Sequence, residues 1–342
     1  MRIAIVTDAW HPQINGVVTT LSHTCTQLQR LGHELRVITP GEFPTLALPT
    51  YRSIRVALCG PGGVARLLRD FTPDAVHIAT EGPLGHAARR WCLRQSFPFT
   101  TSYHTQFPEY LRLRVPVPLE LSYAYLRRFH AQAARTLVPT PQQAQLLRDR
   151  GFEHLVLWPR GVDTELFRPD GEVVLDLPRP VLLYLGRVAV EKNVQAFLDL
   201  NTPGSKLVIG DGPDRRWMQQ RHPDVHFAGF KTGTELAQLI AACDLLVFPS
   251  LTDTFGLVML EAMACGLPVA AFPVTGPIDV VQHGVTGALD ADLGCAVAAA
   301  LQIDPAACVR FARSRSWQQA SSVFLNQLQP AHHHRQPLDR AG

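Results

Sequence analysis

Two carboxylates stand eight residues apart in an otherwise apolar segment, residues 249–270 (PSLTDTFGLVMLEAMACGLPVA). Residues 255–265 are apolar nearly all round, which predicts a buried helix with Glu261 as its one charged side chain. Asp253 precedes the expected helix N-terminus, where free N–H groups and the helix dipole favour an anion, and Gly256 lets a phosphate approach closely. An unpaired buried carboxylate is costly, so the pair predicts a ligand site. The alternative is that Asp253 caps the helix and Glu261 meets an internal arginine.

A second loop, in the segment YLGRVAVEKN, holds two cations five residues apart, Arg187 and Lys192. Gly186 ends an apolar strand pattern there, so both side chains can face one anion around the turn. A guanidinium fork and a mobile ammonium together suit a diphosphate. Only three of the 32 basic residues are lysine, which adds weight to Lys192. The alternative is a basic surface loop with Glu191 as a neighbour.

The N-terminal half offers two further candidates. The loop DAWHPQINGVV brings Asn15 and Gly16 to the start of a predicted helix, where Gly16 can present N–H groups to a phosphate. Asn15 also permits a left-handed backbone. The loop lacks the G-x-G-x-x-G pattern, so a dinucleotide cofactor is disfavoured. His104 follows a predicted strand and leaves the sheet toward a cleft, unless it is simply satisfied in a domain interface.

Short apolar runs that alternate with helical stretches must position these residues. We predict strands at residues 3–6, 34–39, 75–78, 99–103, 137–138, 181–185, 206–209, 225–227, 245–248 and 269–272. This alternation predicts parallel sheets with helical crossovers, that is, an α/β fold. A Pro-flanked segment, 167–180, divides the series into two Rossmann-like domains that face each other across a cleft. Ligands of such sheets bind beyond the carboxyl ends of the strands, so the cleft is expected to hold the chemistry.

Length and composition set wider limits. A chain of 342 residues, 46% hydrophobic, suggests about two domains on a prior of roughly 150 residues each. The N-terminus lacks a signal-peptide pattern and no segment has the length of a transmembrane helix, so we expect a cytoplasmic protein. The seven cysteines are scattered without a C-x-x-C pair and predict neither disulfides nor a metal site.

The basic residues are concentrated in the first half. Residues 1–165 hold 18 arginines and 12 acids, whereas the remainder holds 14 basic residues and 17 acids. A basic amphipathic pattern at 64–71, and arginines among apolar residues at 111–137, fit an anionic membrane surface. Those arginines are Arg112, Arg114, Arg127, Arg128 and Arg135. Ordinary solvated faces are the alternative, and the absence of a basic-aromatic platform argues against nucleic acid.

The spacing of Asp253 and Glu261, an acid followed by seven residues and a glutamate, resembles that of the retaining GT-B glycosyltransferases of family four. In that family the first acid contacts the donor sugar and the second holds the ribose hydroxyls. The resemblance therefore implies that Asp253 contacts the sugar and that Phe255, Gly256, Leu257 and Glu261 bind the nucleotide sugar. This chain has Asp253 where many members have glutamate, which is one methylene longer, so we expect the sugar contact to be reset or bridged by water.

The other motifs match the family as well. Arg187 and Lys192 correspond to its diphosphate clamp, which takes over the role of a metal, so the resemblance implies no obligatory metal and no cofactor. Asn15 and Gly16 correspond to its P-x-x-G-G-V loop, with asparagine for the first glycine. The remaining correspondences are His104 beside the donor sugar, and Phe230 and Lys231 at the nucleobase, where an ordinary exposed strand end is the alternative for Lys231. Asp290-Ala291-Asp292 spells a metal-binding D-x-D but follows no strand, so we interpret it as unrelated.

The resemblance implies an acceptor-binding domain at 1–165, a nucleotide-sugar-binding domain at 166–307, a helix at 308–329 that crosses back to the first domain, and a disordered tail at 330–342. It implies retaining transfer of a mannose- or glucose-type hexose from a nucleotide diphosphate sugar to a lipid or glycan hydroxyl. The motifs TDTFG and RGVDTELF resemble the branch of lipid mannosyltransferases and of sulfoquinovosyl or glucosyl diacylglycerol synthases. That branch favours peripheral contact of the N-terminal domain with the inner face of the cell membrane. A sugar-nucleotide epimerase of the same fold and a non-catalytic two-lobed sugar-binding protein stay as alternatives.

Overall fold

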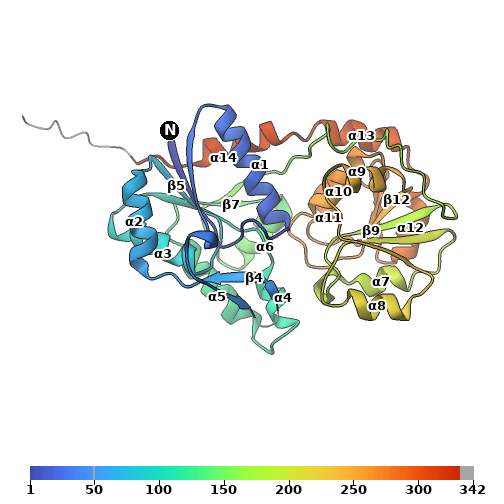
Figure 1. Cartoon of the computed structure of the whole chain (residues 1–342), viewed down its shortest axis with the longest axis horizontal. Helices are drawn as coiled ribbons and strands as arrows, with labels where there is room; N and C mark the ends of the chain where they lie inside the picture. The colour runs from blue at the N-terminus through green and yellow to red at the C-terminus, as the bar shows by residue number, and fades with distance from the viewer. Residues whose placement is uncertain (49–50, 332–342) are drawn as a thin grey trace, which may run out of the picture.

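A computed structural model describes residues 1–48 and 51–331 of the chain. Two α/β domains lie side by side, each built on a six-stranded sheet whose neighbouring strands are all parallel (Figure 1). The predicted fold class, two Rossmann-like domains with parallel sheets, is confirmed. Most of the predicted tail, from residue 332 onward, lies outside the described residues.

The N-terminal sheet contains β1 (Arg2–Val6), β2 (Glu34–Ile38), β5 (Ala75–Ile78), β6 (Phe99–Ser102), β7 (Arg135–Val138) and β8 (Leu155–Leu157). Its strand order is β2-β1-β5-β6-β7-β8. An antiparallel pair, β3 (Thr45–Leu48) and β4 (Tyr51–Ala57), stands apart from it. The helices of this domain are α1 (Gly16–Arg30), α2 (Pro61–Phe71), α3 (Pro83–Arg94), α4 (Phe107–Arg112), α5 (Leu119–His130) and α6 (Pro141–Asp149), with a short 3-10 turn at Pro40–Glu42.

The C-terminal sheet contains β9 (Val181–Leu185), β10 (Ser205–Ile209), β11 (His226–Gly229), β12 (Leu245–Phe248), β13 (Val269–Ala271) and β14 (Gly287–Leu289). Its order is β11-β10-β9-β12-β13-β14. The helical elements after β9 alternate with the strands and then close the chain. They are η2 (Val190–Lys192), α7 (Val194–Leu198), α8 (Arg215–Arg221), α9 (Gly233–Ala241), α10 (Leu257–Ala264), α11 (Pro277–Val280), α12 (Leu293–Ala300), α13 (Pro305–Arg313) and α14 (Trp317–Gln327). The central strands β9 and β12 are buried along their whole length, as their continuous apolar runs require.

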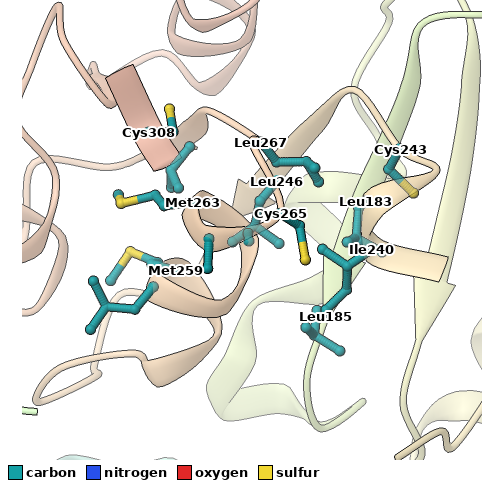
Figure 2. Packing of buried hydrophobic residues seen from close by; sticks show 14 of the residues in the cluster. Leu183, Leu185, Ile240, Cys243, Leu246, Met259, Met263, Cys265, Leu267 and Cys308 are labelled. Atoms are coloured by element: carbon teal, nitrogen blue, oxygen red, sulfur yellow. The ribbon is translucent and has the colours of Figure 1, made fainter. Parts of the chain in front are cut away.

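Helix α10 is the buried helix predicted from residues 255–265. Met259 and Met263 pack in one cluster with Leu246 of the sheet and Cys308 of α13 (Figure 2). The helix begins at Leu257, two residues later than predicted, because Gly256 takes a left-handed conformation with φ of 84° and ends the preceding loop. Phe255 therefore belongs to the loop, not to the helix.

Two chain segments cross between the domains and pair with each other. The N–H of Val162 donates to the carbonyl of Arg315 at 2.9 Å. A Cβ atom on Gly161 would lie 2.3 Å from the nitrogen of Trp317, so only glycine permits this close approach. Instead of one closing helix there are two: α13 packs on α10 of the C-terminal domain, and α14 lies beside α1 of the N-terminal domain (Figure 1).

Within the described ranges, no single helix is long and apolar enough to span a membrane. Helices α12 and α13 taken together have the length and composition of a span, but they are bent by 93° relative to each other.

Candidate active site

Asp253 lies in the loop after β12, at the carboxyl edge of the C-terminal sheet. Its Oδ1 accepts a hydrogen bond from Nζ of Lys192 at 2.6 Å, and the two side chains are only 15% and 21% exposed. Its Oδ2 is buried and has no hydrogen-bond partner among the described residues. Asp253 does not cap α10, because the N-cap is Gly256, which makes no side-chain bond. A buried, unsatisfied carboxylate oxygen in a cleft is a natural acceptor for a ligand hydroxyl.

Lys192 connects the two domains at this point. Its Nζ also donates to the hydroxyl of Tyr110 in α4, at 3.2 Å. Burial lowers the pKa of Lys192, but Asp253 and Tyr110 raise it, and the net shift is upward. Burial, followed by the Asp253 charge, raises the pKa of Tyr110 to about 12. At neutral pH the site therefore holds a fixed ammonium and a neutral phenol next to a carboxylate.

Arg187 follows β9 at the same edge of the sheet, five residues before Lys192. Its carbonyl accepts a hydrogen bond from the hydroxyl of Tyr184 at 2.6 Å, which fixes the start of the turn. Gly186 has a φ of 148°, and a Cβ atom on Gly210 would lie 1.8 Å from the carbonyl oxygen of Gly186. The loops after β9 and β10 thus pack backbone against backbone. This packing presents the Arg187 loop at the edge where open α/β sheets bind ligands.

Glu261 is partly buried in α10, and burial alone raises its pKa to about 7. Its carboxylate has no hydrogen bond or ion pair with any residue in the described ranges, so the alternative of an internal arginine partner is excluded. The neighbouring Leu257 reaches across the cleft, since its Cδ1 lies 3.5 Å from where a Cβ atom on Gly16 would stand. The first turn of α10 and the start of α1 therefore face each other.

The Asn15–Gly16 loop leads into α1, at the predicted helix start. Asn15 is extended, with φ of −162°, and its Oδ1 accepts from the N–H groups of Val17 and Val18 at 3.0 Å each. The left-handed backbone that asparagine permits is not used at this position, because Asn15 serves as the N-cap of α1. Gly16 is the first residue of the helix and faces the cleft at the position described above.

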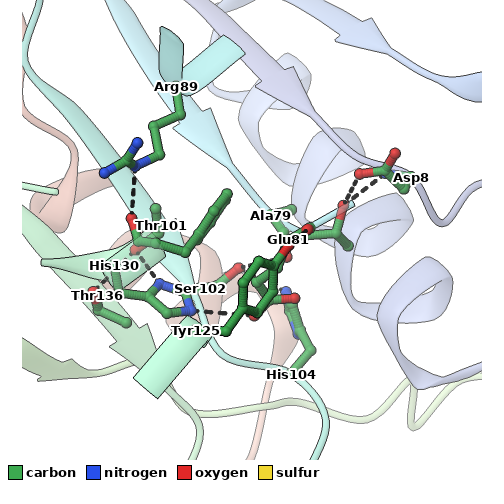
Figure 3. A network of polar contacts seen from close by, with 12 residues as sticks. Asp8, Ala79, Glu81, Arg89, Thr101, Ser102, His104, Tyr125, His130 and Thr136 are labelled. Carbon is green, nitrogen blue, oxygen red and sulfur yellow. Dashed lines mark hydrogen bonds and ion pairs between the residues drawn. The ribbon is translucent and has the colours of Figure 1, made fainter. Parts of the chain in front are cut away.

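His104 lies just beyond β6, between the two domains. Its Nε2 is 2.8 Å from Oγ of Ser102, a contact that Figure 3 shows from close by. Its carbonyl oxygen accepts a hydrogen bond from Oγ1 of Thr254, the residue after Asp253, at 2.7 Å. Burial, then the charge of Arg160, lowers the pKa of His104 well below its usual value. The ring is therefore neutral at physiological pH.

The candidate nucleobase loop lies at the end of β11. Phe230 is 48% exposed, which leaves a ring face open to a ligand. Lys231 forms an ion pair with Glu235 one turn further along, in α9. The ammonium of Lys231 is thus engaged locally, and any contact with a base would come from the backbone of this loop.

Several cleft residues were missed in the sequence. Arg114, just after α4, forms a 2.6 Å ion pair with Glu191, the neighbour of Lys192. Tyr110 and Thr254 make the contacts described above, and Nη2 of Arg160 lies 3.4 Å from Nδ1 of His104. Tyr110 and Arg114 come from the basic, apolar stretch that suggested a membrane surface, and Arg160 comes from the motif RGVDTELF. In the sequence, these residues are distinguished only by being polar and close to a motif. Their contacts could not be predicted, because each depends on how the two domains pack together.

The D-x-D sequence directly follows β14, so the prediction that no strand precedes it was wrong, but both of its carboxylates have structural roles. Oδ1 of Asp290 accepts from the N–H of Asp292, and Asp292 in turn caps α12 by accepting from Gly294 and Cys295. Both carboxylates are thus used in a turn and a helix cap. In the part of the chain that the structure describes, no three His, Cys, Asp or Glu side chains are grouped as a metal site.

The chain is similar in sequence to known glycosyltransferases. The family description Glycosyltransferase Family 4 matches residues 14–166, and the description Glycosyl transferases group 1 matches residues 179–303. A GDP-mannose-dependent alpha-mannosyltransferase of Mycobacterium tuberculosis is 31% identical over 84% of this chain and 83% of its own length. An alpha-monoglucosyldiacylglycerol synthase of Streptococcus pneumoniae is 26% identical over 89% of this chain and 79% of its own.

A solved structure shows the same architecture. Sucrose-phosphate synthase from Thermosynechococcus elongatus superposes with a TM-score of 0.75, covers 95% of this chain and 97% of its own, and is 21% identical. The relatives named above are transferases, which favours a transferase over the epimerase and the binding protein. Together with the two family matches, these likenesses show that the chain belongs to the family-four glycosyltransferases of the GT-B fold and is a hexosyltransferase.

Proposed function

We propose that the chain transfers mannose from GDP-mannose to a lipid-linked hydroxyl, with retention of the anomeric configuration and without a metal ion. The donor follows the GDP-mannose-dependent relative, and the lipid acceptor follows the diacylglycerol-modifying one. The observation that carries the proposal is the Lys192–Asp253 pair, whose second carboxylate oxygen is buried without a partner. This arrangement puts a cation for a diphosphate beside an acceptor for a sugar hydroxyl.

Each residue has a role in this scheme. Lys192 and Arg187 bind the diphosphate, and the N–H groups at Gly16 add to that charge stabilisation. Asp253 accepts a hydrogen bond from a sugar hydroxyl, while Glu261 accepts from the ribose. His104 lines the sugar site. The C-terminal domain thus holds the ribose and the base, which Phe230 and the Lys231 backbone border, while the diphosphate lies between Lys192, Arg187 and the N-terminal Gly16.

The reaction exchanges one C–O bond for another at the anomeric carbon. The bond to the diphosphate breaks, and its electrons leave with GDP. The acceptor oxygen bonds to the same face of the sugar, and its proton passes to the departing phosphate oxygen. Asp253 is held by Lys192 beside the sugar hydroxyls, which suits a front-face route better than a covalent double displacement. Catalysis then depends on positioning and on charge stabilisation by Lys192 and Arg187.

The test is a donor screen with EDTA present. The purified chain is incubated with GDP-mannose, UDP-glucose, UDP-galactose and UDP-sulfoquinovose in anionic lipid vesicles, and nucleotide release and product anomer are measured. We expect GDP release with an α-linked product, reduced roughly 100-fold or more in Lys192→Ala and Asp253→Ala. Lys206→Ala is the matched control, because Lys206 donates to the carbonyl of Leu200 away from the cleft. Release from a UDP-sugar alone, a β-linked product, or a strict metal requirement would contradict the corresponding part of the proposal.

We further propose that the N-terminal domain contacts an anionic membrane at the inner face of the cell membrane. Helix α2 does not supply that contact through its apolar side, since Val64 and Leu68 are fully buried in the core. Arg114 is paired with Glu191, and Arg135 is only partly exposed and donates to carbonyls of α14, so neither is part of the surface. Arg127 also donates to a carbonyl, that of Arg150, but it is exposed. The basic surface that we assign is formed by exposed arginines of two adjacent helices, α3 and α5. Its members are Arg90, Arg94, Arg127 and Arg128.

A further inference from the structure

Arg160 is a buried cation without an acidic partner. It is 4% exposed, and no carboxylate of the described residues lies within 4 Å of its guanidinium. Nη1 donates to the carbonyls of Trp158 at 2.6 Å and Pro159 at 3.3 Å, and the guanidinium lies 4.3 Å from the Trp158 ring centre. Burying a charge in this way is costly unless its donors are well satisfied. The donors on Nη2 therefore call for an explanation.

That donor determines the state of His104. Nη2 of Arg160 lies 3.4 Å from Nδ1 of His104 in hydrogen-bond geometry. A guanidinium can only donate, so Nδ1 must accept and carry no proton. In the neutral ring the proton is then on Nε2, which donates to Oγ of Ser102 at 2.8 Å. Ser102 keeps its own proton for the carbonyl of Ala79, 3.3 Å away (Figure 3). Both ring nitrogens of His104 are thereby occupied.

The fixed ring holds a main-chain contact across the cleft. The carbonyl of His104 accepts from Oγ1 of Thr254, and the preceding residue, Asp253, carries the candidate sugar-binding carboxylate. Gln106, two residues after His104, adds a second contact, from Nε2 to the carbonyl of Asp253 at 3.5 Å. A change in the orientation of His104 would therefore be transmitted to the Asp253 loop.

Arg160 itself belongs to the segment that crosses between the domains. The next two residues, Gly161 and Val162, pack against the second crossing at Arg315 and Trp317. Any rotation of one domain relative to the other has to be accommodated at this pair of crossings. Arg160 is thus the side chain that connects the crossing to His104.

We infer that Arg160 is a positioning residue for the transfer reaction: from the interdomain crossing it fixes the ring of His104 and, through the His104 carbonyl, the loop of Asp253. The inference rests on the proposed function insofar as Asp253 binds the donor sugar. It also assigns a role to His104. The ring neither gives nor takes a proton during transfer, because Arg160 and Ser102 use both nitrogens.

The first test needs no activity. Nitrogen chemical shifts of the chain labelled with 15N-histidine, with His104 assigned by its loss in His104→Ala, report the tautomer directly. We expect a neutral ring protonated on Nε2, unchanged from pH 6 to pH 9, since Arg160 and the neutral His77 are the titratable groups that face it. In Arg160→Met we expect the fixed tautomer to be lost. A proton on Nδ1 of His104 in the wild-type chain would overturn the inference, whatever the chain transfers.

The second test uses the transfer reaction. Arg160→Met should lower kcat roughly 10- to 100-fold with the KM for the donor changed less than about 3-fold, because misplaced groups reduce the rate more than binding. Arg160→Lys keeps the charge but not the fork and should not restore kcat. In a double-mutant cycle, Arg160→Met should cost less than about 2-fold in kcat when His104 is already alanine. Additive losses, or full activity in Arg160→Lys, would contradict a role exerted through His104.

Arg135→Met is the matched control for stability. Arg135 also binds the N-terminal sheet to the chain that follows the second crossing, through the carbonyls of Asn326 and Gln327 at the end of α14, and no contact joins it to His104 among the described residues. It should lower the melting temperature and leave kcat within about 2-fold of wild type. Equal losses of kcat in Arg135→Met and Arg160→Met would show that Arg160 acts only on stability. Absence of transfer in the wild-type chain with every donor would count against the proposed function, while the tautomer measurement would still decide this inference.

Discussion

Two carboxylates of one short segment have opposite environments. Asp253 has its Oδ1 on Lys192, and a donor diphosphate would compete with that carboxylate for the ammonium. Glu261 has no cation beside it among the described residues, and burial, which disfavours the charge, raises its pKa to about 7. The same acid-x7-Glu pattern thus supplies two different groups. The charge of Asp253 is balanced by Lys192, whereas the charge of Glu261 becomes favourable only when a ligand donates hydrogen bonds to it.

The raised pKa of Glu261 should make the stability of the chain depend on pH. The pKa of Glu261 in the folded chain, about 7, lies above that of an unfolded glutamate, so the folded state binds the extra proton between those values. Stability linked to this group is therefore highest at low pH and is lost as the pH rises to about 7. Glu261→Gln should stabilise the chain by about 1–2 kcal/mol at pH 8 and should have no such effect at pH 4.5. Thermal unfolding at both pH values measures this; equal stabilisation at the two would disprove the raised pKa.

Ligand binding should report the same carboxylate. Ribose hydroxyls donate hydrogen bonds to a charged carboxylate more strongly than to a neutral one, so bound nucleotide should lower the pKa of Glu261. Nucleotide affinity of the wild-type chain is then expected to rise between pH 6 and pH 8 and to be flat over that range in Glu261→Gln.

At the scale of elements, α4 is a short helix of the N-terminal domain that contacts the cation loop of the other domain. Tyr110 reaches Lys192, and Arg114 reaches Glu191, whose side chain is only 4% exposed. An ion pair with a buried member holds its loop more firmly than a surface pair does. The position of Lys192 therefore depends on a helix outside its own domain.

Arg114→Met is predicted to weaken nucleotide diphosphate binding by about tenfold, equivalent to about 1.4 kcal/mol, because the loop of Lys192 loses its cross-cleft support. Arg112→Met is the matched control, since Arg112 ends the same helix, is exposed and has no ion pair within the described ranges. Calorimetric titration with GDP in the absence of lipid measures both. Equal affinity of the two variants would show that the Arg114–Glu191 contact does not position Lys192.

The elements themselves could be predicted closely from the sequence. Apolar runs of four or five residues gave β9 and β12 with their observed limits, because strands covered on both faces must be apolar throughout. The β3–β4 pair, β8 and β14 were missed. β14 spans only three residues, with glycine at its start, and so carries little pattern. The start of α10 was misplaced because a left-handed glycine in an apolar segment looks like part of the helix.

At the scale of the whole molecule, the motifs indicated which residues face the cleft but not what holds them there. Lys192 and Asp253 were both candidates, yet their mutual ion pair was not predicted, since 61 residues separate them. The contact of Arg160 with His104 was not predicted either, since it joins residues 56 positions apart. Such contacts depend on the packing of two folded domains, and no local periodicity encodes them.

The exposed arginines of the N-terminal domain should bind the chain to anionic membranes. Arg90, Arg94, Arg127 and Arg128 are exposed on the adjacent helices α3 and α5, and none has an ion-pair partner in the ranges that the structure covers. Each basic residue near an anionic bilayer contributes about 1 kcal/mol, so replacing Arg127 and Arg128 by glutamate should lower the fraction of chain bound to phosphatidylglycerol vesicles by more than tenfold. Replacing Arg168 and Arg310 on the C-terminal domain by glutamate gives the same change in net charge and should leave binding within about 2-fold, because those arginines lie on the other domain. Vesicle flotation at low and high salt separates the cases: equal losses in both double variants would mean that net charge, not this surface, attracts the chain.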